Sequence, residues 1–139
     1  HAKISTGGAQ DKFGVSAAEV LAAFARRDEL PGLDLQGVAV HIGSQLTSLD
    51  PLEAAFRKVG ALIGELRSAG HAIHVADLGG GLGVQYDPAA PQPPSPAAYG
   101  EMVQRVTRDW NVRLVFEPGR LLVGNAGVLL TRVIRVKPG

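Results

Sequence analysis

The 139-residue sequence contains no cysteine, and aromatic residues make up only 5% of it. Without cysteine, the chain has neither a disulfide framework nor a thiolate zinc site, and such a composition fits a reducing compartment. No apolar run approaches the roughly 18 to 20 residues of a membrane span, and the N-terminus lacks the apolar region of a signal peptide. We therefore expect a soluble, cytoplasmic protein without a membrane partner.

The sequence also lacks an excess of either charge. Its 14 Lys and Arg residues nearly balance 13 Asp and Glu residues, which leaves a formal net charge of +1. Because nucleic-acid binding depends on a basic surface and often on stacking aromatic rings, we expect no nucleic-acid partner. The length suits one modest domain rather than a complete large enzyme. The first residue, His1, indicates an internal piece or a processed chain.

Signals for metal binding and for hydrolase chemistry are absent as well. The four histidines are scattered, and no H-E-x-x-H motif or acidic calcium loop is present. Ser44 lacks the G-x-S-x-G setting of a hydrolase nucleophile. We therefore expect no bound metal and no hydrolase activity.

Capping signals predict three helices. Ser16 with Glu19 forms a capping box, Asp50 is the predicted N-cap before Pro51, and Ser95 precedes another proline. The predicted helices span residues 16–27, 50–69 and 95–108.

Runs of β-branched and small apolar residues predict four strands, the first of them buried on both faces. The predicted strands span residues 35–42, 72–78, 112–116 and 127–136. Residues 1–14 and the proline-rich residues 86–96 are expected to be loops.

Strands that alternate with helices predict an α/β fold with a parallel sheet, either doubly wound or part of a (β/α) barrel. Three successive strands are followed by unusual residues, beginning at His41, Asp77 and Glu117. Because a barrel collects its active site at the C-terminal ends of its strands, this pattern favours a barrel segment.

Each of these strand ends has a structural and a functional interpretation. Gly79–Gly83 (GGGLG) is either a tight turn or a backbone cradle for a phosphate, although it matches neither the Walker nor the dinucleotide spacing. Glu117 and Arg120 are either a surface ion pair or a site in which the acid faces a heteroaromatic nitrogen and the guanidinium binds a carboxylate or phosphate. His41 is either a core histidine or a ring that stacks on a flat cofactor, with the Ser44 hydroxyl on the cofactor's phosphate.

Taken together, the motifs resemble the diaminopimelate decarboxylases, which are fold-type III pyridoxal-phosphate decarboxylases. The motifs that carry the resemblance occur in the family's order: H-x-K-I-x-T-G from His1, K-F-G from Lys12, H-I-G-S-Q from His41, D-x-G-G-G-x-G from Asp77 and E-P-G-R from Glu117. The HIGSQ and KFG segments favour this family over its ornithine and arginine relatives.

The resemblance implies a role for each motif residue in binding pyridoxal 5′-phosphate. His41 stacks on the cofactor ring, and Ser44, Gly80 and Gly81 hold its phosphate. Glu117 pairs with the pyridine nitrogen and keeps it protonated.

The rest of the E-P-G-R motif completes the cofactor pocket. Its members are Pro118, Gly119 and Arg120, and Arg120 also contacts the substrate.

The resemblance further implies a partial (β/α)₈ barrel, of which this chain provides about the last three strands. Residues 1–120 are the C-terminal part of the cofactor-binding barrel, and residues 121–139 begin a C-terminal β domain. The family's Schiff-base lysine and the cysteine that the partner subunit of a homodimer supplies have no counterpart here. We therefore expect the chain alone to be inactive.

The predicted activity of the parent enzyme is the decarboxylation of meso-diaminopimelate to L-lysine and CO2. One alternative is an ornithine- or arginine-type decarboxylase of the same fold. The other is a non-catalytic homologue that binds pyridoxal phosphate without turnover.

Overall fold

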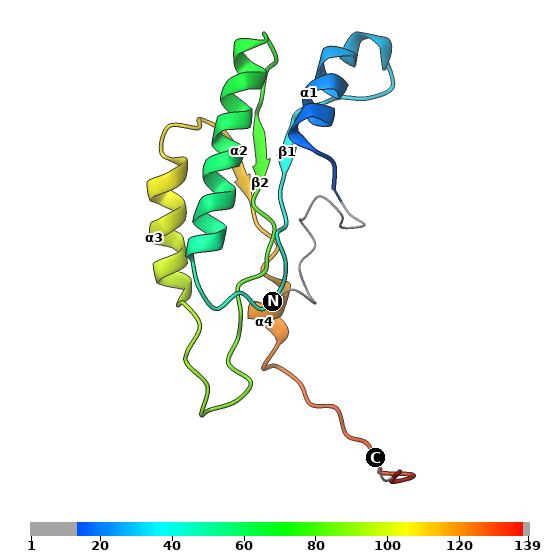
Figure 1. The fold of residues 1–139 in the computed structure, drawn as a ribbon, viewed down its shortest axis with the longest axis vertical. Helices are drawn as coiled ribbons and strands as arrows, with labels where there is room; N and C mark the ends of the chain where they lie inside the picture. The colour runs from blue at the N-terminus through cyan, green and yellow to red at the C-terminus, as the bar shows by residue number, and fades with distance from the viewer. Residues whose placement is uncertain (1–13, 138–139) are drawn as a thin grey trace.

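The computed structural model describes residues 14–137, so nearly all of the predicted loop 1–14, including Lys3 and Lys12, lies outside the described residues. The described chain alternates helices and strands (Figure 1). The elements are α1 (Ala17–Ala25), the 3-10 helix η1 (Arg27–Glu29), β1 (Gly37–Ala39), α2 (Asp50–Ser68), β2 (Val75–Asp77), α3 (Pro96–Thr107), β3 (Arg113–Val115) and α4 (Gly119–Val123). The predicted α/β class is confirmed.

Local capping explains where the helices begin. The Glu19 N–H donates to Ser16 Oγ at 3.3 Å and the Glu19 carboxylate accepts from the Ser16 N–H at 2.6 Å, which confirms the predicted capping box. Ser95 caps α3 as predicted, because its Oγ accepts from the Ala98 N–H at 3.1 Å. The N-cap of α2 is Leu49 rather than Asp50. This prediction was one residue late because Asp50 already has helical backbone, and its own N–H donates to Ser48 Oγ at 3.2 Å.

The three strands form one parallel sheet in the order β1-β2-β3. Each strand is only three residues long, shorter than predicted. Backbone hydrogen bonds nevertheless continue the pairing beyond the C-terminal ends. The Val40 N–H donates to Asp77 O at 2.9 Å, the Leu78 N–H donates to Val115 O at 2.9 Å, and the Glu117 N–H donates to Gly79 O at 2.8 Å. This pairing fixes where the residues after each strand lie.

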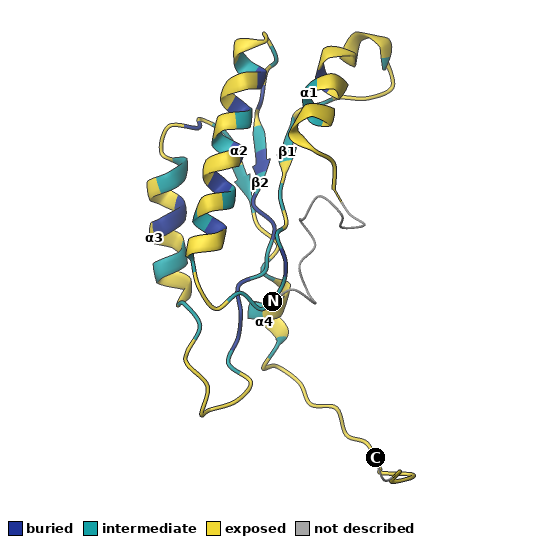
Figure 2. Ribbon diagram, in the orientation of Figure 1, coloured by how far each residue is buried: buried dark blue, intermediate teal, exposed yellow. Residues whose placement is uncertain are grey.

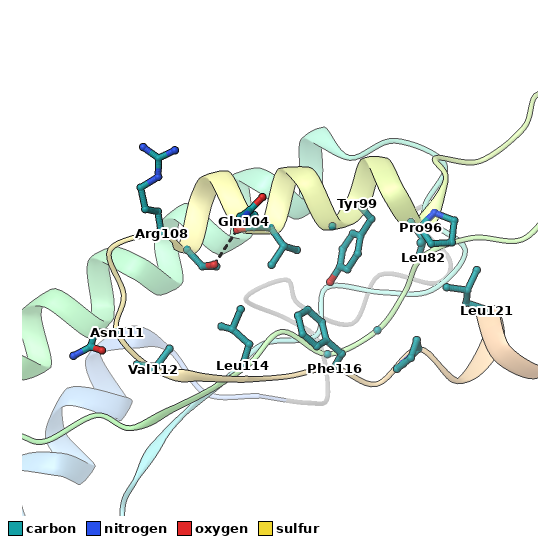
Figure 3. A pocket seen from close by; sticks show the side chains of 16 residues that line it. Leu82, Pro96, Tyr99, Gln104, Arg108, Asn111, Val112, Leu114, Phe116 and Leu121 are labelled. Carbon is teal, nitrogen blue, oxygen red and sulfur yellow. Dashed lines mark hydrogen bonds between the residues drawn. The ribbon is translucent and has the colours of Figure 1, made fainter.

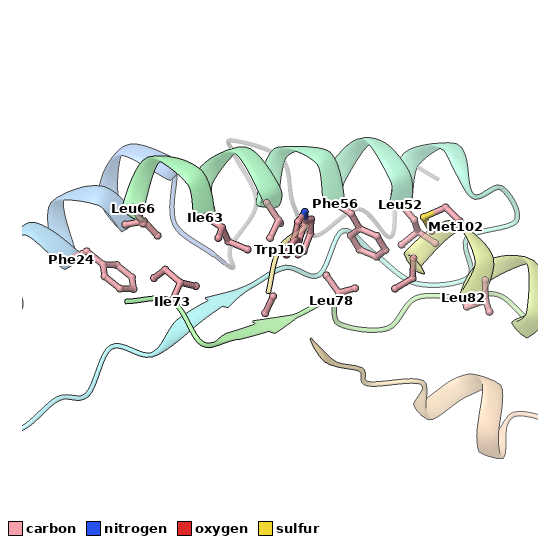
Figure 4. Packing of buried hydrophobic residues seen from close by; sticks show 13 residues of the cluster. Phe24, Leu52, Phe56, Ile63, Leu66, Ile73, Leu78, Leu82, Met102 and Trp110 are labelled. Carbon is pink, nitrogen blue, oxygen red and sulfur yellow. The ribbon is translucent and has the colours of Figure 1, made fainter. Parts of the chain in front are cut away.

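The core lies between the sheet and α2, which packs against α1 and α3 (Figure 4). The buried residues of α2 recur every three or four positions and so share one helix face. They are Leu52, Phe56, Val59, Ile63 and Leu66. Opposite them on the sheet, Ala76 and Leu78 are fully enclosed. The burial pattern in Figure 2 therefore follows from an apolar stripe that faces an apolar sheet.

One ion pair joins α2 to α3, and a second lies within α2. The Glu53 carboxylate accepts from Arg57 Nη2 and from Arg105 Nη2, both at 2.6 Å. The hydrogen bond from Arg57, together with that from Arg105, lowers the pKa of Glu53 below its usual value.

The other face of the sheet has no helix over it within residues 14–137. Ala39 and Arg113, whose side chains point to this face, are exposed. The prediction that the first strand is buried on both faces is therefore wrong for the described chain, because the helices cover one face only. No described helix is long and apolar enough to cross a membrane.

The C-terminal part of the chain differs from the prediction. Residues 119–123 form α4, and the strand expected at 127–136 is absent from the structure. Its apolar side chains are instead exposed, with Val128 at 97% and Ile134 at 96% (Figure 2). Strand propensity alone does not make a strand, since each strand needs a neighbour for its backbone groups. No segment within residues 14–137 pairs with this one.

Candidate functional site

Three polar or flexible positions lie in one row beyond the C-terminal ends of the strands. Ala39, Asp77 and Val115 are paired across the sheet, and His41, Gly79 and Glu117 follow them two positions later. The Glu117 N–H donates to Gly79 O at 2.8 Å, and the Gly80 N–H donates to His41 Nδ1 at 3.4 Å, so the three strand ends are neighbours. The parallel sheet thus brings together residues that are 38 positions apart in the sequence.

The glycine cluster is packed between its two neighbours. A Cβ added to Gly80 would collide with the backbone carbonyl oxygen of Glu117, and one added to Gly81 would collide with that of Gly43. Gly81 also has a φ of +98°. These close approaches account for glycine at both positions, since a side chain at either one would collide with the neighbouring backbone.

His41 contacts the glycine cluster directly. Its Nδ1 accepts a hydrogen bond from the Gly80 N–H at 3.4 Å. The side chain is exposed at the mouth of the strands, and the interpretation of His41 as an enclosed core histidine is wrong for the described chain. The contact sets the orientation of the imidazole relative to the glycine backbone.

The loop after β1 pairs with the loop after β2. The Leu46 N–H donates to Gly81 O at 2.8 Å, and the Gly83 N–H donates to Leu46 O at 3.0 Å. The Gln45 carboxamide adds two bonds to the backbone of Val84. Ser44 is half-buried within this paired region. Gln45 stands in the H-I-G-S-Q motif, which by itself predicts no role for this residue.

Arg120 contacts Tyr86, a residue for which the sequence predicted no role. Its Nη1 donates to the Tyr86 hydroxyl at 2.7 Å, and the guanidinium carbon lies 5.8 Å from the centre of the same ring. No ion pair joins Glu117 to Arg120 in the described part of the chain, so the interpretation of the two as a surface ion pair is wrong. An aromatic residue three positions after the glycine cluster was the only signal for Tyr86.

A groove of about 760 Å³ runs between α3 and β3 (Figure 3). Its walls are mainly apolar, and Tyr99 and Phe116 meet there edge to face with ring centres 6.2 Å apart. Burial raises the pKa of Tyr99 to about 12. Gly80 and Pro118 also line the groove, whereas His41, Ser44, Glu117 and Arg120 do not. The groove is therefore an apolar space beside the strand-end row.

The donors and acceptors at the strand ends suit a flat, anionic, heteroaromatic ligand. Within the described residues, the backbone N–H groups of Gly81 and Leu82 donate to no acceptor, and the Ser44 hydroxyl and the Glu117 carboxylate have no hydrogen-bond partner. Amides, a hydroxyl and a guanidinium match a phosphate, and a carboxylate matches a protonated ring nitrogen. These residues therefore fit pyridoxal phosphate.

Comparison with known proteins identifies relatives of the whole chain. A family model described as pyridoxal-dependent decarboxylase, pyridoxal binding domain, matches residues 1–124. Diaminopimelate decarboxylase from Zymomonas mobilis is 57% identical over 99% of this chain and 32% of that protein. The protein of the same name from Pseudomonas aeruginosa is 45% identical over 99% of this chain and 32% of its own length.

The structural comparison agrees. A crystal structure of diaminopimelate decarboxylase from Helicobacter pylori complexed with L-lysine has a TM-score of 0.79 and 32% identity, over 86% of this chain and 30% of that one. The chain spans about a third of the length of the relatives it matches. The resemblance inferred from the motifs is confirmed, and so is the cofactor class at the level of the family: the chain belongs to the pyridoxal binding domain family of the pyridoxal-dependent decarboxylases.

Proposed function

We propose that this chain is the cofactor-binding part of an enzyme that decarboxylates meso-diaminopimelate to L-lysine and CO2. The row of His41, Gly79 and Glu117 at the strand ends carries the proposal, because it combines a flat imidazole, a glycine backbone and a carboxylate at neighbouring strand ends. The names of relatives up to 57% identical favour this substrate over ornithine or arginine.

The proposal includes a (β/α)₈ barrel of which the chain forms about the last three strands. The outer edges of β1 and β3 have no neighbour within the described residues. The groove beside β3 and a second space of about 740 Å³ between α1, α2 and β1 are mainly apolar, as expected where further helices and strands pack. Residues 1–120 then belong to the barrel and residues 121–139 begin a β domain.

Pyridoxal phosphate supplies a conjugated ring that takes up the electron pair left on the α-carbon when CO2 departs. The protein's own residues bind and orient this ring. His41 presents its imidazole plane, and the Gly80 N–H holds that imidazole through Nδ1. The Glu117 carboxylate holds a proton on the pyridine nitrogen.

The phosphate and the substrate take the remaining donors. The Ser44 hydroxyl and the backbone N–H groups of Gly81 and Leu82 bind the phosphate, and Gly80, whose own N–H donates to His41, lets the backbone approach it. Tyr86 occupies one N–H of the Arg120 guanidinium, and the other donors are free to complete the cofactor pocket and to bind a substrate carboxylate. Pro118 and Gly119 form the turn between Glu117 and Arg120, which the Gly119 N–H closes by donating to Glu117 O at 2.9 Å.

The Glu117→Gln variant of the full-length enzyme tests the role of the carboxylate. We expect this variant to retain much of the cofactor affinity and to lose roughly 100-fold or more in kcat, because a neutral amide no longer favours the protonated ring. Glu101→Gln, at an exposed position of α3, is the matched control. Wild-type turnover in Glu117→Gln would refute the assignment.

A substrate panel decides between the proposed function and its alternatives. Preference for diaminopimelate supports the proposal, and preference for ornithine or arginine favours the second type of decarboxylase. Cofactor binding without release of CO2 from any of the three favours the non-catalytic homologue. The homodimer and the cytoplasmic location are part of the same proposal, and light scattering and cell fractionation test them.

A further inference from the structure

We propose that Gln45 is a positioning residue that fixes the spacing of the phosphate-binding loops. The side chain does this by joining the loop after β1 to the loop after β2. This inference rests on the proposed function, because the two loops carry the groups assigned to the cofactor phosphate.

The Gln45 side chain makes two hydrogen bonds to the backbone of Val84 in the loop after β2. Its Nε2 donates to Val84 O at 2.5 Å, and its Oε1 accepts from the Val84 N–H at 3.2 Å. One carboxamide thus satisfies both backbone groups of a single buried residue. Together with the two backbone bonds of Leu46, to Gly81 and Gly83, four hydrogen bonds join the loops.

The backbone conformation of Gln45 indicates that these contacts hold it in place. Its φ is +57°, a left-handed conformation that is unfavourable for a residue other than glycine. Glycine or asparagine would adopt this conformation at lower cost. Glycine has no side chain, however, and asparagine is one methylene too short to make the same pair of bonds. The reach of the glutamine carboxamide explains its presence at this position.

The position of Gln45 links this geometry to the phosphate. Ser44 precedes it directly, and across the joined loops lie the backbone N–H groups of Gly81 and Leu82, which donate to no acceptor within the described chain. A phosphate held by the Ser44 hydroxyl and these amides needs the two loops at a fixed separation. The Gln45 side chain is bonded to Val84, so it acts by holding the loops and need not touch the phosphate.

The test compares affinities for pyridoxal 5′-phosphate and for pyridoxal, which lacks the phosphate. The full-length apoprotein is titrated with each compound, and the bound cofactor is followed by its visible absorbance. In Gln45→Met, which has similar length and neither hydrogen bond, we expect the affinity for pyridoxal 5′-phosphate to fall about tenfold. The affinity for pyridoxal should stay within about twofold of the wild-type value, because that compound has no phosphate for the two loops to hold.

The Gln45→Glu variant gives a second, reversible readout. Its carboxylate accepts from the Val84 N–H but cannot donate to Val84 O until it is protonated. We expect a loss of affinity for pyridoxal 5′-phosphate at pH 7 that recovers, relative to wild type at the same pH, as the pH falls toward about 4.5. Gln104→Met and Gln104→Glu are matched controls, because Gln104 is exposed on α3 and its side chain makes no hydrogen bond to the described residues.

Each outcome decides a different point. The inference is supported if Gln45→Met loses affinity for pyridoxal 5′-phosphate but not for pyridoxal, and if the affinity of Gln45→Glu for pyridoxal 5′-phosphate recovers at low pH. Equal losses for both compounds, or none, overturn it while leaving the proposed function intact. If Gln45→Met fails to fold, the pH profile of Gln45→Glu decides in the same way. A wild-type apoprotein that does not bind pyridoxal 5′-phosphate refutes the proposed function itself.

Discussion

Replacing Gly80 with alanine tests the close approach between the glycine cluster and the strand that carries Glu117. A Cβ at this position would collide with the backbone carbonyl oxygen of Glu117, and it would lie 3.2 Å from the carbonyl carbon. Restoring ordinary contact requires the two backbones to separate by roughly 1 Å, which is an overpacking change. The Glu117 N–H would also move relative to Gly79 O, to which it donates at 2.8 Å.

Two effects of Gly80→Ala follow, and their magnitudes differ. Overpacking costs about 1 to 3 kcal/mol, while the lower entropy of the unfolded chain returns about 0.4 to 1 kcal/mol. We therefore expect the free energy of unfolding to fall by about 1 to 2 kcal/mol. A displacement of about 1 Å can reduce catalysis roughly 100-fold. We therefore expect kcat to fall by up to about 100-fold even under conditions in which the variant remains folded.

The assays are urea unfolding and steady-state turnover of the full-length protein, with Gly64→Ala as the control. Gly64 lies in α2, is exposed, and has nothing within 4 Å of an added Cβ. Alanine there should stabilise the protein by up to about 1 kcal/mol through helix propensity. The two substitutions therefore change stability in opposite directions. A Gly80→Ala protein that is as stable and as active as wild type would refute the argument.

The remaining predictions concern the core and the sheet, and urea unfolding checks each of them. Gly60→Ala should destabilise the protein by about 1 kcal/mol, because the new Cβ would lie 2.7 Å from the indole nitrogen of the buried Trp110. This overpacking outweighs the gain in helix propensity. An increase in stability would contradict the prediction. Arg67→Met should lower the free energy of unfolding by about 1 to 3 kcal/mol, because it removes the donors that bind Trp110 O at 2.6 Å and Ile73 O at 2.8 Å. Arg57→Met, at an exposed position, is the control and should have a smaller effect. Because burial raises the pKa of Tyr99 from 10.0 to about 12, the folded state favours the neutral phenol, and its contribution to stability is lost as the pH rises from 10 to 12. Tyr99→Phe should remove this part of the alkaline destabilisation, and identical pH profiles would show that Tyr99 does not cause it.

The sequence determined the features that depend on neighbouring residues. Capping residues such as Ser16 and Ser95 act within one turn of helix, so their position predicts where the helices begin. The apolar period of α2 likewise predicts its buried face. The positions of His41, Glu117 and the glycine cluster at strand ends followed from the alternation of strands and helices, since parallel strands place their C-terminal ends at one edge.

Only the tertiary structure decided the features that depend on contacts between distant segments. The apolar residues 127–136 have strand propensity, but they find no neighbour among the described residues and form no strand. Gln45 pairs with Val84 and Arg120 with Tyr86, over separations of 39 and 34 residues. Such pairs depend on which loops the sheet brings together. Local propensity carries no information about that arrangement, because it is set by the packing of the helices on one face of the sheet.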